Sequence, residues 1–126
     1  MNHIKIDKSS GIFQANYSNV SVVMAARNEE KAIEGVIRDI RTVTNGQAEI
    51  VVVDGSDDRT PDLARILGAK VIRQEPGGYG VAVRLALMSA SRDIIITTDC
   101  DGTYPMEQIP VFVKLIDEGY DVVSGS

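Results

Sequence analysis

The stretch Asp93-Ile94-Ile95-Ile96-Thr97-Thr98-Asp99-Cys100-Asp101 is an apolar run that ends in two carboxylates. Its β-branched residues predict a buried strand. Residues i and i+2 of an extended segment point the same way, so Asp99 and Asp101 should share one side of the chain. Carboxylates held close together repel each other unless a cation or a proton intervenes. The pair therefore indicates a site for Mg²⁺ or Mn²⁺, although acidic turns also serve simply to end strands.

Runs of the same kind alternate with amphipathic segments along the chain. The predicted strands span residues 20–25, 50–54, 70–73, 94–99 and 121–124. Apolar residues at the i, i+3, i+4, i+7 spacing of one helix face lie between them, at Ile33, Val36, Ile37 and Ile40 and again at Ile109, Phe112, Val113 and Ile116. This alternation predicts an α/β fold, a Rossmann-like three-layer parallel sheet with helices on both faces.

The composition is that of one globular domain. The chain has 126 residues, 44% of them hydrophobic, and a formal charge of -5. Residues 1–19 lack periodicity and are interpreted as a poorly ordered or weakly paired leader, followed by one domain over 20–126. No basic cluster supports binding to nucleic acid. Cys100 has no partner for a disulfide, and no transmembrane segment or secretion leader is recognised, so a cytoplasmic location is expected.

Polar residues cluster where the predicted strands end, which is the edge at which sheets of this kind bind ligands. The segment Asp54-Gly55-Ser56-Asp57-Asp58-Arg59-Thr60 follows the second strand. Its glycine permits a tight turn, and Asp54 in the cleft could accept a hydrogen bond from a nucleobase N–H. The other interpretation is a turn and helix cap formed by Asp57, Asp58, Thr60 and Pro61, with Gly68 ending the helix.

The glycine-rich segment Gly77-Gly78-Tyr79-Gly80 precedes an apolar helix. It lacks the lysine and hydroxyl residues of a P-loop and does not follow the first strand, so its glycines more simply let the helix approach the cleft. Arg84 on this helix either pairs with an acid or steers a phosphate. Cys100 is a softer ligand than Mg²⁺ or Mn²⁺ prefers and is interpreted as a small filler with a backbone contact.

Five segments together resemble the family 2 glycosyltransferases, especially the polyprenyl-phosphate (dolichol-phosphate) mannose and glucose synthases. They follow that family's order and spacing, and they are residues 22–29, 53–60, 78–87, 99–105 and 120–126. They look like the first-strand motif ending in Asn-Glu, the Asp-Asp-Gly-Ser motif, the glycine-rich helix, the DxD segment and the strand before Gly-Ser-Arg. The resemblance implies the nucleotide-binding half of the GT-A glycosyltransferase fold.

The resemblance also implies roles for individual residues. Ala25, Arg27 and Glu29 would line the nucleoside, and Asp54 would read the base. Asp99 and Asp101 would bind the metal and the diphosphate, with the Cys100 backbone near the ribose and Thr103 as a further polar ligand of the metal. The sequence departs from the family pattern at four positions, which leave the identity of the donor open: Ala25, Arg27, Val53 and Tyr79.

By the same resemblance, the parent enzyme would transfer a sugar with inversion from a nucleotide-diphosphate donor, GDP-mannose or a UDP-sugar, to an acceptor such as polyprenyl or dolichyl phosphate. In that family the acceptor groove and the general base follow the strand at which this chain stops, so the base is expected beyond Ser126 and the fragment looks truncated. We therefore expect donor binding without turnover, self-association through an uncovered surface, and a parent enzyme at the cytoplasmic face of a membrane.

Three alternatives remain open at this point. A phosphoacceptor receiver module shares the length, the alternation and an acidic Mg²⁺ pocket, but it requires acids after the first strand and a lysine after the fifth, where this chain has Arg27 and Ser124-Gly125-Ser126. A sugar nucleotidyltransferase would need a glycine-rich loop after the first strand. A binding-only relic of the glycosyltransferase fold would keep the donor site alone.

Overall fold

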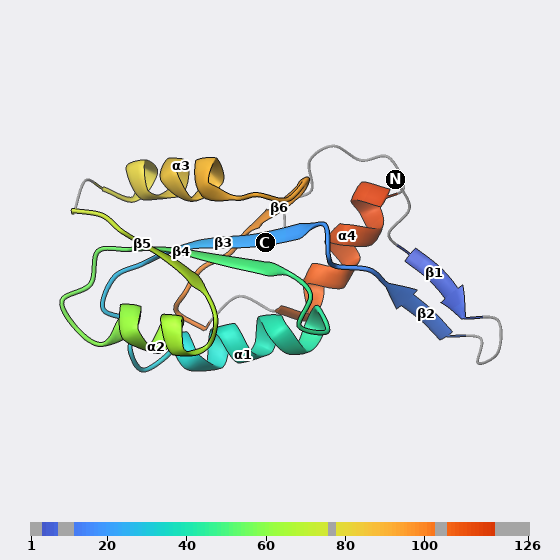
Figure 1. Cartoon of the computed structure of the whole chain (residues 1–126), viewed down its shortest axis with the longest axis horizontal. Helices are drawn as coiled ribbons and strands as arrows, with labels where there is room; N and C mark the ends of the chain where they lie inside the picture. The colour runs from blue at the N-terminus through green and yellow to red at the C-terminus, as the bar shows by residue number, and fades with distance from the viewer. Residues whose placement is uncertain (1–3, 8–11, 76–77, 103–105, 118–126) are drawn as a thin grey trace.

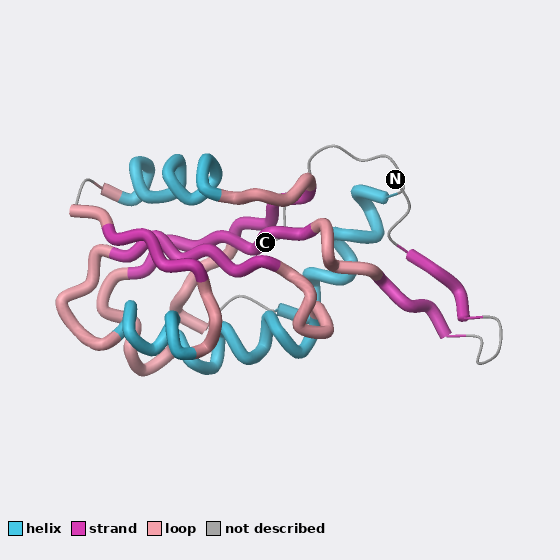
Figure 2. Tube along the Cα trace, in the orientation of Figure 1, coloured by secondary structure: helices cyan, strands magenta, loops and turns pink. Residues whose placement is uncertain are grey.

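The computed structural model describes residues 4–7, 12–75, 78–102 and 106–117 (Figure 1). Within these residues the chain forms an antiparallel hairpin, a parallel sheet and the helices that cover it (Figure 2). In chain order the elements are β1 (Ile4–Asp7), β2 (Ile12–Ala15), β3 (Val20–Ala26), α1 (Ile33–Val43), β4 (Glu49–Asp54), α2 (Thr60–Ile66), β5 (Lys70–Arg73), α3 (Tyr79–Ser89), β6 (Ile94–Thr97), the 3₁₀ helix η1 (Met106–Gln108) and α4 (Ile109–Asp117). The predicted alternation of strands and helices is confirmed over this range.

The central sheet has the strand order β5-β4-β3-β6, and its neighbouring strands are all parallel. β3 lies in the interior of the sheet and is buried along nearly its whole length. The chain moves in one direction from β3 through β4 to β5 and then returns to place β6 on the other side of β3. The strand order therefore reverses between β3 and β6, and ligands bind outside the carboxyl ends of the strands at such a point.

Helices cover both faces of this sheet, as the sequence predicts. Figure 1 shows α3 on one side of the sheet and α1 and α2 on the other. A large core cluster joins β3 to α1, α2 and α4 and includes Val22, Ile37 and Ile109. A smaller cluster joins β3 and β4 to α3 and includes Val23 and Ala86. Successive residues of β3 thus enter different layers, because side chains alternate across a strand.

The two amphipathic helices form where the apolar spacing predicts them. In α1 the four apolar residues of the 33–40 pattern are at most 3% exposed and form the face against the sheet. In α4 the pattern is divided, since Ile109 and Val113 are fully buried while Phe112 and Ile116 are partly buried against the same cluster. Burial of an apolar stripe therefore accounts for both helices.

Helix α2 departs from the predicted capping pattern at its first turn. Thr60, the predicted N-cap, is the first helical residue, and the cap position is Arg59, whose side chain makes no capping bond. The carboxylate of Asp58 takes that role, because it accepts a hydrogen bond from the Thr60 N–H at 2.9 Å. Gly68 follows the helix with φ +86° and donates its N–H to the Arg65 carbonyl at 3.0 Å. Gly68 thus ends the helix as predicted, since this left-handed conformation favours glycine.

The predicted leader contains a regular element. β1 and β2 pair antiparallel, from Ile4 opposite Ala15 to Asp7 opposite Ile12. The described residues of the leader are therefore paired with each other, and the division into a leader and a domain at residue 20 stays a prediction. β6 ends at Thr97, two residues before the predicted end. The Thr98 N–H still donates to the Val23 carbonyl at 3.1 Å, and the backbone bends at residues 100–102. The predicted strand over 121–124 lies outside the described residues.

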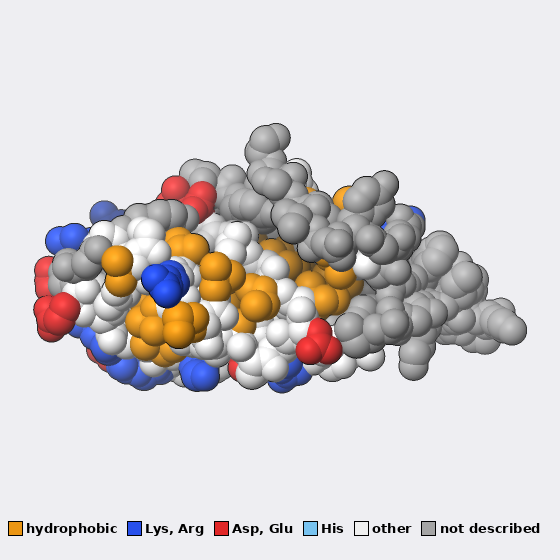
Figure 3. Space-filling model, turned by 90° about the horizontal axis from the view of Figure 1, so that it is seen from above, with side chains coloured by type: hydrophobic (Ala, Val, Ile, Leu, Met, Phe, Trp, Pro, Cys, Tyr) orange, Lys and Arg blue, Asp and Glu red, His pale blue; other side chains and the backbone are white. Residues whose placement is uncertain are grey.

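The face that carries α3 leaves apolar side chains in solvent (Figure 3). In α3 the exposed fractions are 52% for Val81, 42% for Leu87 and 74% for Met88, and Ile95 of β6 is 41% exposed. Apolar side chains gathered on one exposed surface are usually covered by another part of a protein. The predicted self-association through this surface stays a prediction.

Over the ranges that the structure describes, none of the helices combines the length and the apolar character that crossing a membrane requires.

A hydrogen-bonded group fastens the amino ends of the strands. Glu49 accepts hydrogen bonds from the Ser21 hydroxyl at 2.7 Å and from the N–H and hydroxyl of Ser91 at 2.9 and 2.7 Å. The Ser21 hydroxyl in turn accepts the Arg92 N–H at 3.2 Å. Burial by itself raises the pKa of Glu49, but the bonds from Ser91 and Ser21 and the charge of Lys70 lower it overall. The carboxylate thus ties the segment before β6 to the start of β4.

We expect Glu49→Gln to lower the free energy of unfolding at pH 7 by about 1 kcal/mol, because an amide accepts fewer and weaker hydrogen bonds than a carboxylate. A carboxylate whose pKa is lower in the folded chain contributes stability above its ordinary pKa of 4.5 and loses it as the pH falls through the folded value. Urea unfolding at pH 7 and pH 3 should show the difference between variant and wild type shrinking in acid.

The matched control for this variant is Glu34→Gln. Glu34 pairs with Arg38 on the exposed side of α1, and such pairs contribute little to stability. The control should therefore unfold like the wild type at both pH values. A loss for Glu49→Gln that is as large at pH 3 as at pH 7 would show that the carboxylate charge is not the cause.

Candidate functional site

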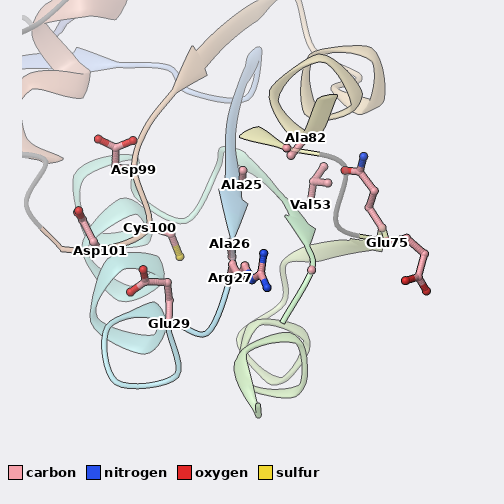
Figure 4. A pocket seen from close by; sticks show the side chains of 13 residues that line it. Ala25, Ala26, Arg27, Glu29, Val53, Glu75, Ala82, Asp99, Cys100 and Asp101 are labelled. Carbon is pink, nitrogen blue, oxygen red and sulfur yellow. The ribbon is translucent and has the colours of Figure 1, made fainter. Parts of the chain in front are cut away.

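A pocket of about 420 Å³ lies at the carboxyl ends of the strands, where the strand order reverses (Figure 4). The last residues of β3 and β4, the segments that follow β3, β4, β5 and β6, and the start of α3 contribute to it. They are Ala25, Ala26, Arg27, Glu29, Val53, Gly55, Gln74, Glu75, Gly78, Ala82, Asp99, Cys100 and Asp101. Apolar walls with a few polar groups, at this size, are typical of small-molecule sites.

The pocket has an acidic part and an apolar part. In Figure 4 the side chains of residues 29 and 99–101 lie on one side of Arg27, and those of Val53 and Ala82 lie on the other. Arg27 is exposed and, among the described residues, makes no hydrogen bond or ion pair. A guanidinium in this position is available to an anionic ligand.

Hydrogen bonds between two loops fix the rim of the pocket. The Asn28 N–H donates to the Ser56 hydroxyl at 2.7 Å, and the Asn28 side-chain carbonyl accepts the Asp57 N–H at 2.9 Å. The Glu29 N–H donates to the Thr60 hydroxyl at 2.9 Å. Asn28 has φ 53°, a left-handed conformation that asparagine tolerates better than most residues. The polar residues of the 54–60 segment therefore hold the loop after β3 in place, besides starting α2.

Asp54 does not line the pocket. Its side chain is 0% exposed. One carboxylate oxygen accepts the Ser56 hydroxyl at 2.6 Å, and the other accepts the Ser56 N–H at 3.1 Å and pairs with the Arg73 guanidinium. Both oxygens are therefore occupied by the protein. The contact between Asp54 and a nucleobase stays a prediction, and the buried carboxylate would have to become accessible to make it.

Negative charge is concentrated in the acidic part of the pocket. Burial, and after it the charges of Glu29, Asp101, Asp54 and Asp99, raise the pKa of the Cys100 thiol to about 12. Within the part of the chain that the structure describes, the carboxylates of Glu29 and Asp99 make no hydrogen bond or ion pair. Carboxylates that face a pocket without a cationic partner favour the binding of a cation.

The donor set suits a divalent cation that is shared with a ligand. Asp99 and Asp101 are exposed while Thr98 and Cys100 are buried, and both aspartates line the pocket. The described residues hold no group of three or more His, Cys, Asp or Glu arranged around a metal position. Mg²⁺ is commonly bound by one or two carboxylates together with phosphate oxygens of a substrate, which two aspartates can provide. Thr103, the third predicted ligand, lies outside the described residues.

Three further residues differ between the sequence prediction and the pocket. Arg84 was predicted but lies elsewhere, whereas Gln74 and Glu75 line the pocket without having been predicted. Arg84 is exposed on α3 and does not line the pocket, so its pairing or phosphate-steering role stays a prediction. Gln74 and Glu75 line the pocket but belong to no motif. Their position directly after a predicted strand was the available signal, because ligands bind at that edge.

The parallel sheet between two helical layers, with a pocket at the reversal point, is the arrangement of a nucleotide-binding α/β domain, and solved structures identify it as part of a GT-A glycosyltransferase fold. Mannosyl-3-phosphoglycerate synthase from Rubrobacter xylanophilus has a TM-score of 0.64 and 27% identity, over 71% of this chain and 33% of its own. TarS of S. aureus has a TM-score of 0.63 and 27% identity, over 79% of this chain and 20% of its own.

Sequence comparison gives the family. The model of glycosyl transferase family 2 matches residues 21–126. A dolichyl-phosphate hexose transferase from Haloferax volcanii is 58% identical over 109 residues, which are 86% of this chain and 48% of the relative. The low-salt glycan biosynthesis hexosyltransferase Agl6 from the same organism is 36% identical, over 85% of this chain and 27% of its own. The chain belongs to glycosyl transferase family 2, and it spans about half or less of the length of these curated relatives.

This membership confirms the predicted family and fold. It decides against the receiver module and the sugar nucleotidyltransferase, which share only the alternation of strands and helices and the acidic pocket. The family match begins at the start of β3, so the β1–β2 hairpin precedes the shared region.

We expect the Cys100 thiol to be unreactive in the folded chain. With a pKa of about 12, only about one thiol in 10⁴ is ionised at pH 8, and the thiolate is the form that reacts. Labelling with iodoacetamide at pH 8, followed by mass spectrometry, should give almost no adduct in buffer and complete modification in urea. Labelling in buffer at the rate of the unfolded chain would show that Cys100 is neither buried nor surrounded by negative charge.

Proposed function

We propose that this chain binds the nucleotide-diphosphate sugar of a glycosyltransferase that passes the sugar to a polyprenyl or dolichyl phosphate. The observation that carries the proposal is the pocket, in which an apolar wall, a guanidinium and an acidic pair meet in one cavity. Family membership supports glycosyl transfer. The name of the Haloferax relative, a dolichyl-phosphate hexose transferase, supports the class of acceptor.

The two parts of the pocket suit the two ends of such a donor. The nucleoside would lie against Ala25, Val53 and Ala82, which offer apolar surface. The diphosphate and the sugar would extend toward Asp99 and the residues beside it. Arg27, which lies between the two parts, would offer a positive charge that persists at any physiological pH (Figure 4).

A diphosphate cannot lie beside bare carboxylates, because charges of the same sign repel. Mg²⁺ or Mn²⁺ held by Asp99 and Asp101 would remove that repulsion, and when bound it would stabilise the charge on the departing diphosphate. The protein's own contribution is to bring the two carboxylates to the same pocket. Cys100 between them stays a neutral thiol, so it adds no charge at neutral pH.

Transfer would proceed by direct displacement at the anomeric carbon, with inversion, as the family resemblance implies. The bond from that carbon to the diphosphate breaks while a bond to an acceptor oxygen forms. A phosphomonoester, with a second pKa of about 6, is mostly a dianion at neutral pH. The oxygen of a lipid phosphate would therefore need less help from a general base than a hydroxyl acceptor. A lipid acceptor would also place the parent enzyme at a membrane surface.

A thermal-shift panel tests donor binding. UDP, GDP, UDP-glucose and GDP-mannose would each be added at millimolar concentration with Mn²⁺ or with EDTA. A ligand at 100 times its dissociation constant stabilises the folded state by about 2.7 kcal/mol, which raises the melting temperature of a domain of this size by several degrees. We expect a shift for one base, with Mn²⁺ only. An equal shift in EDTA would contradict the metal's role, and no shift with any nucleotide would contradict donor binding.

Asp99→Asn and Asp101→Asn test the two metal ligands. Each should remove the Mn²⁺-dependent part of the shift without lowering the melting temperature of the free chain, because both carboxylates are exposed. Asp39→Asn is the matched control, since Asp39 is exposed on α1 and does not line the pocket. If the two variants keep the full Mn²⁺-dependent shift, the metal is not held by this pair.

A further inference from the structure

Two successive residues of β4 have different relations to the pocket. Val53 lines the pocket and packs in the cluster beneath α3, whereas Asp54 does not line it. Asp54 lies opposite Arg73 in the register of β4 and β5, so the two side chains are cross-strand neighbours. Side chains alternate across a strand, and position 53 is therefore the one that can present a group to a nucleoside. In this sequence that position holds valine, which can accept no hydrogen bond.

The carboxylate of Asp54 is turned to the protein and not to the pocket. Its oxygens receive two hydrogen bonds from Ser56 and the guanidinium of Arg73, and the side chain is fully buried. A base N–H could reach it only after the groups that bury it, Arg73 among them, had moved. Leaving a buried carboxylate without its partner is costly. Asp54 therefore acts as the centre of a turn and not as a group that faces the ligand.

Gln74 has the properties that Asp54 lacks. It lines the pocket directly after β5. Its backbone is held to the end of β4, since its N–H donates to the Asp54 carbonyl at 2.9 Å. Its side-chain amide, by contrast, makes no hydrogen bond to any residue that the structure describes. A fixed backbone with an unpaired amide is suited to reading a ligand.

The neighbouring polar residues are less suited to that role. Arg27 can only donate hydrogen bonds, and Glu75 can only accept them. Figure 4 also shows the Glu75 carboxylate turned away from Arg27 and Val53. The edge of uracil or guanine presents an N–H donor next to a carbonyl acceptor, and a single amide pairs with both groups.

We propose that Gln74 is the residue that reads the nucleobase of the donor, pairing its amide with the adjacent N–H and carbonyl of uracil or guanine while the base rests on Val53. This inference depends on the proposed function, because it assigns specificity within the same donor site. Asp54 and Arg73 then serve to hold the turn from which Gln74 extends.

Gln74→Glu is the test variant. A carboxylate accepts hydrogen bonds from both the N1–H and the N2 amino group of guanine, but from only one N–H of uracil, whose carbonyl repels the second oxygen. The ratio of GDP affinity to UDP affinity should therefore rise at least about fivefold, given the discrimination typical of bidentate pairs. The affinities would be measured by isothermal titration calorimetry with Mn²⁺ on the whole chain.

Two further variants separate base reading from charge and from folding. Gln108→Glu adds the same charge on η1, outside the pocket lining, and should leave the ratio unchanged. Gln74→Ala removes the amide and should weaken the preferred nucleotide about fivefold, a loss expected for its hydrogen bonds, with an unchanged melting temperature.

The outcomes distinguish this inference from the function on which it depends. A higher ratio in Gln74→Glu alone supports Gln74 as the base-reading residue. Nucleotide binding by the wild type with an unchanged ratio in Gln74→Glu overturns the inference and leaves the proposed function standing. A changed ratio in Asp54→Asn, with none in Gln74→Glu, returns base reading to Asp54. A wild-type chain that binds neither nucleotide contradicts the proposed function and this inference together.

Discussion

The parallel pairing of β3 with β4 on one side and β6 on the other is the constraint on which the rest of the structure depends. A strand with neighbours on both edges and helices on both faces must be apolar almost throughout, and β3 meets that condition. The chain leaves β3 toward β4 first and returns toward β6 later, so the two connections diverge at the carboxyl edge. The pocket lies where they part, and every group that lines it owes its position to this arrangement.

The sequence predicts the strands and helices, because burial of apolar residues determines them. It does not predict which side chains become neighbours, because that depends on how the strands pair. The β-branched run before Asp99 is compatible only with a buried strand, and the 33–40 spacing only with a helix, because the apolar residues must face the core. The surroundings of Asp54 depend on which residue of β5 lies opposite, and that is Arg73, a match that no local pattern reveals. Gln74 likewise reaches the pocket through strand order alone. At the start of α2, Asp58 and Thr60 are both predicted caps, and the hydrogen bond from the Thr60 N–H selects Asp58.

The chemistry of the pocket follows from an imbalance of charge. Carboxylates outnumber cations among its lining residues, and the neutral Cys100 thiol leaves that excess undiminished. An anionic ligand can enter such a place only with a cation of its own or beside Arg27. The overall charge of -5 is therefore compatible with a diphosphate ligand, because local groups and not the sum over the chain decide the affinity.

The group around Glu49 lies at the amino ends of the strands, whereas the pocket lies at their carboxyl ends. This hydrogen-bonded group is thus separated, by the length of the strands, from the residues that line the pocket. A scaffold of this kind can exchange the side chains at one edge while the other edge keeps it folded. A substitution among the pocket residues therefore leaves the Glu49 group in place, so recognition of a ligand can change without loss of these bonds.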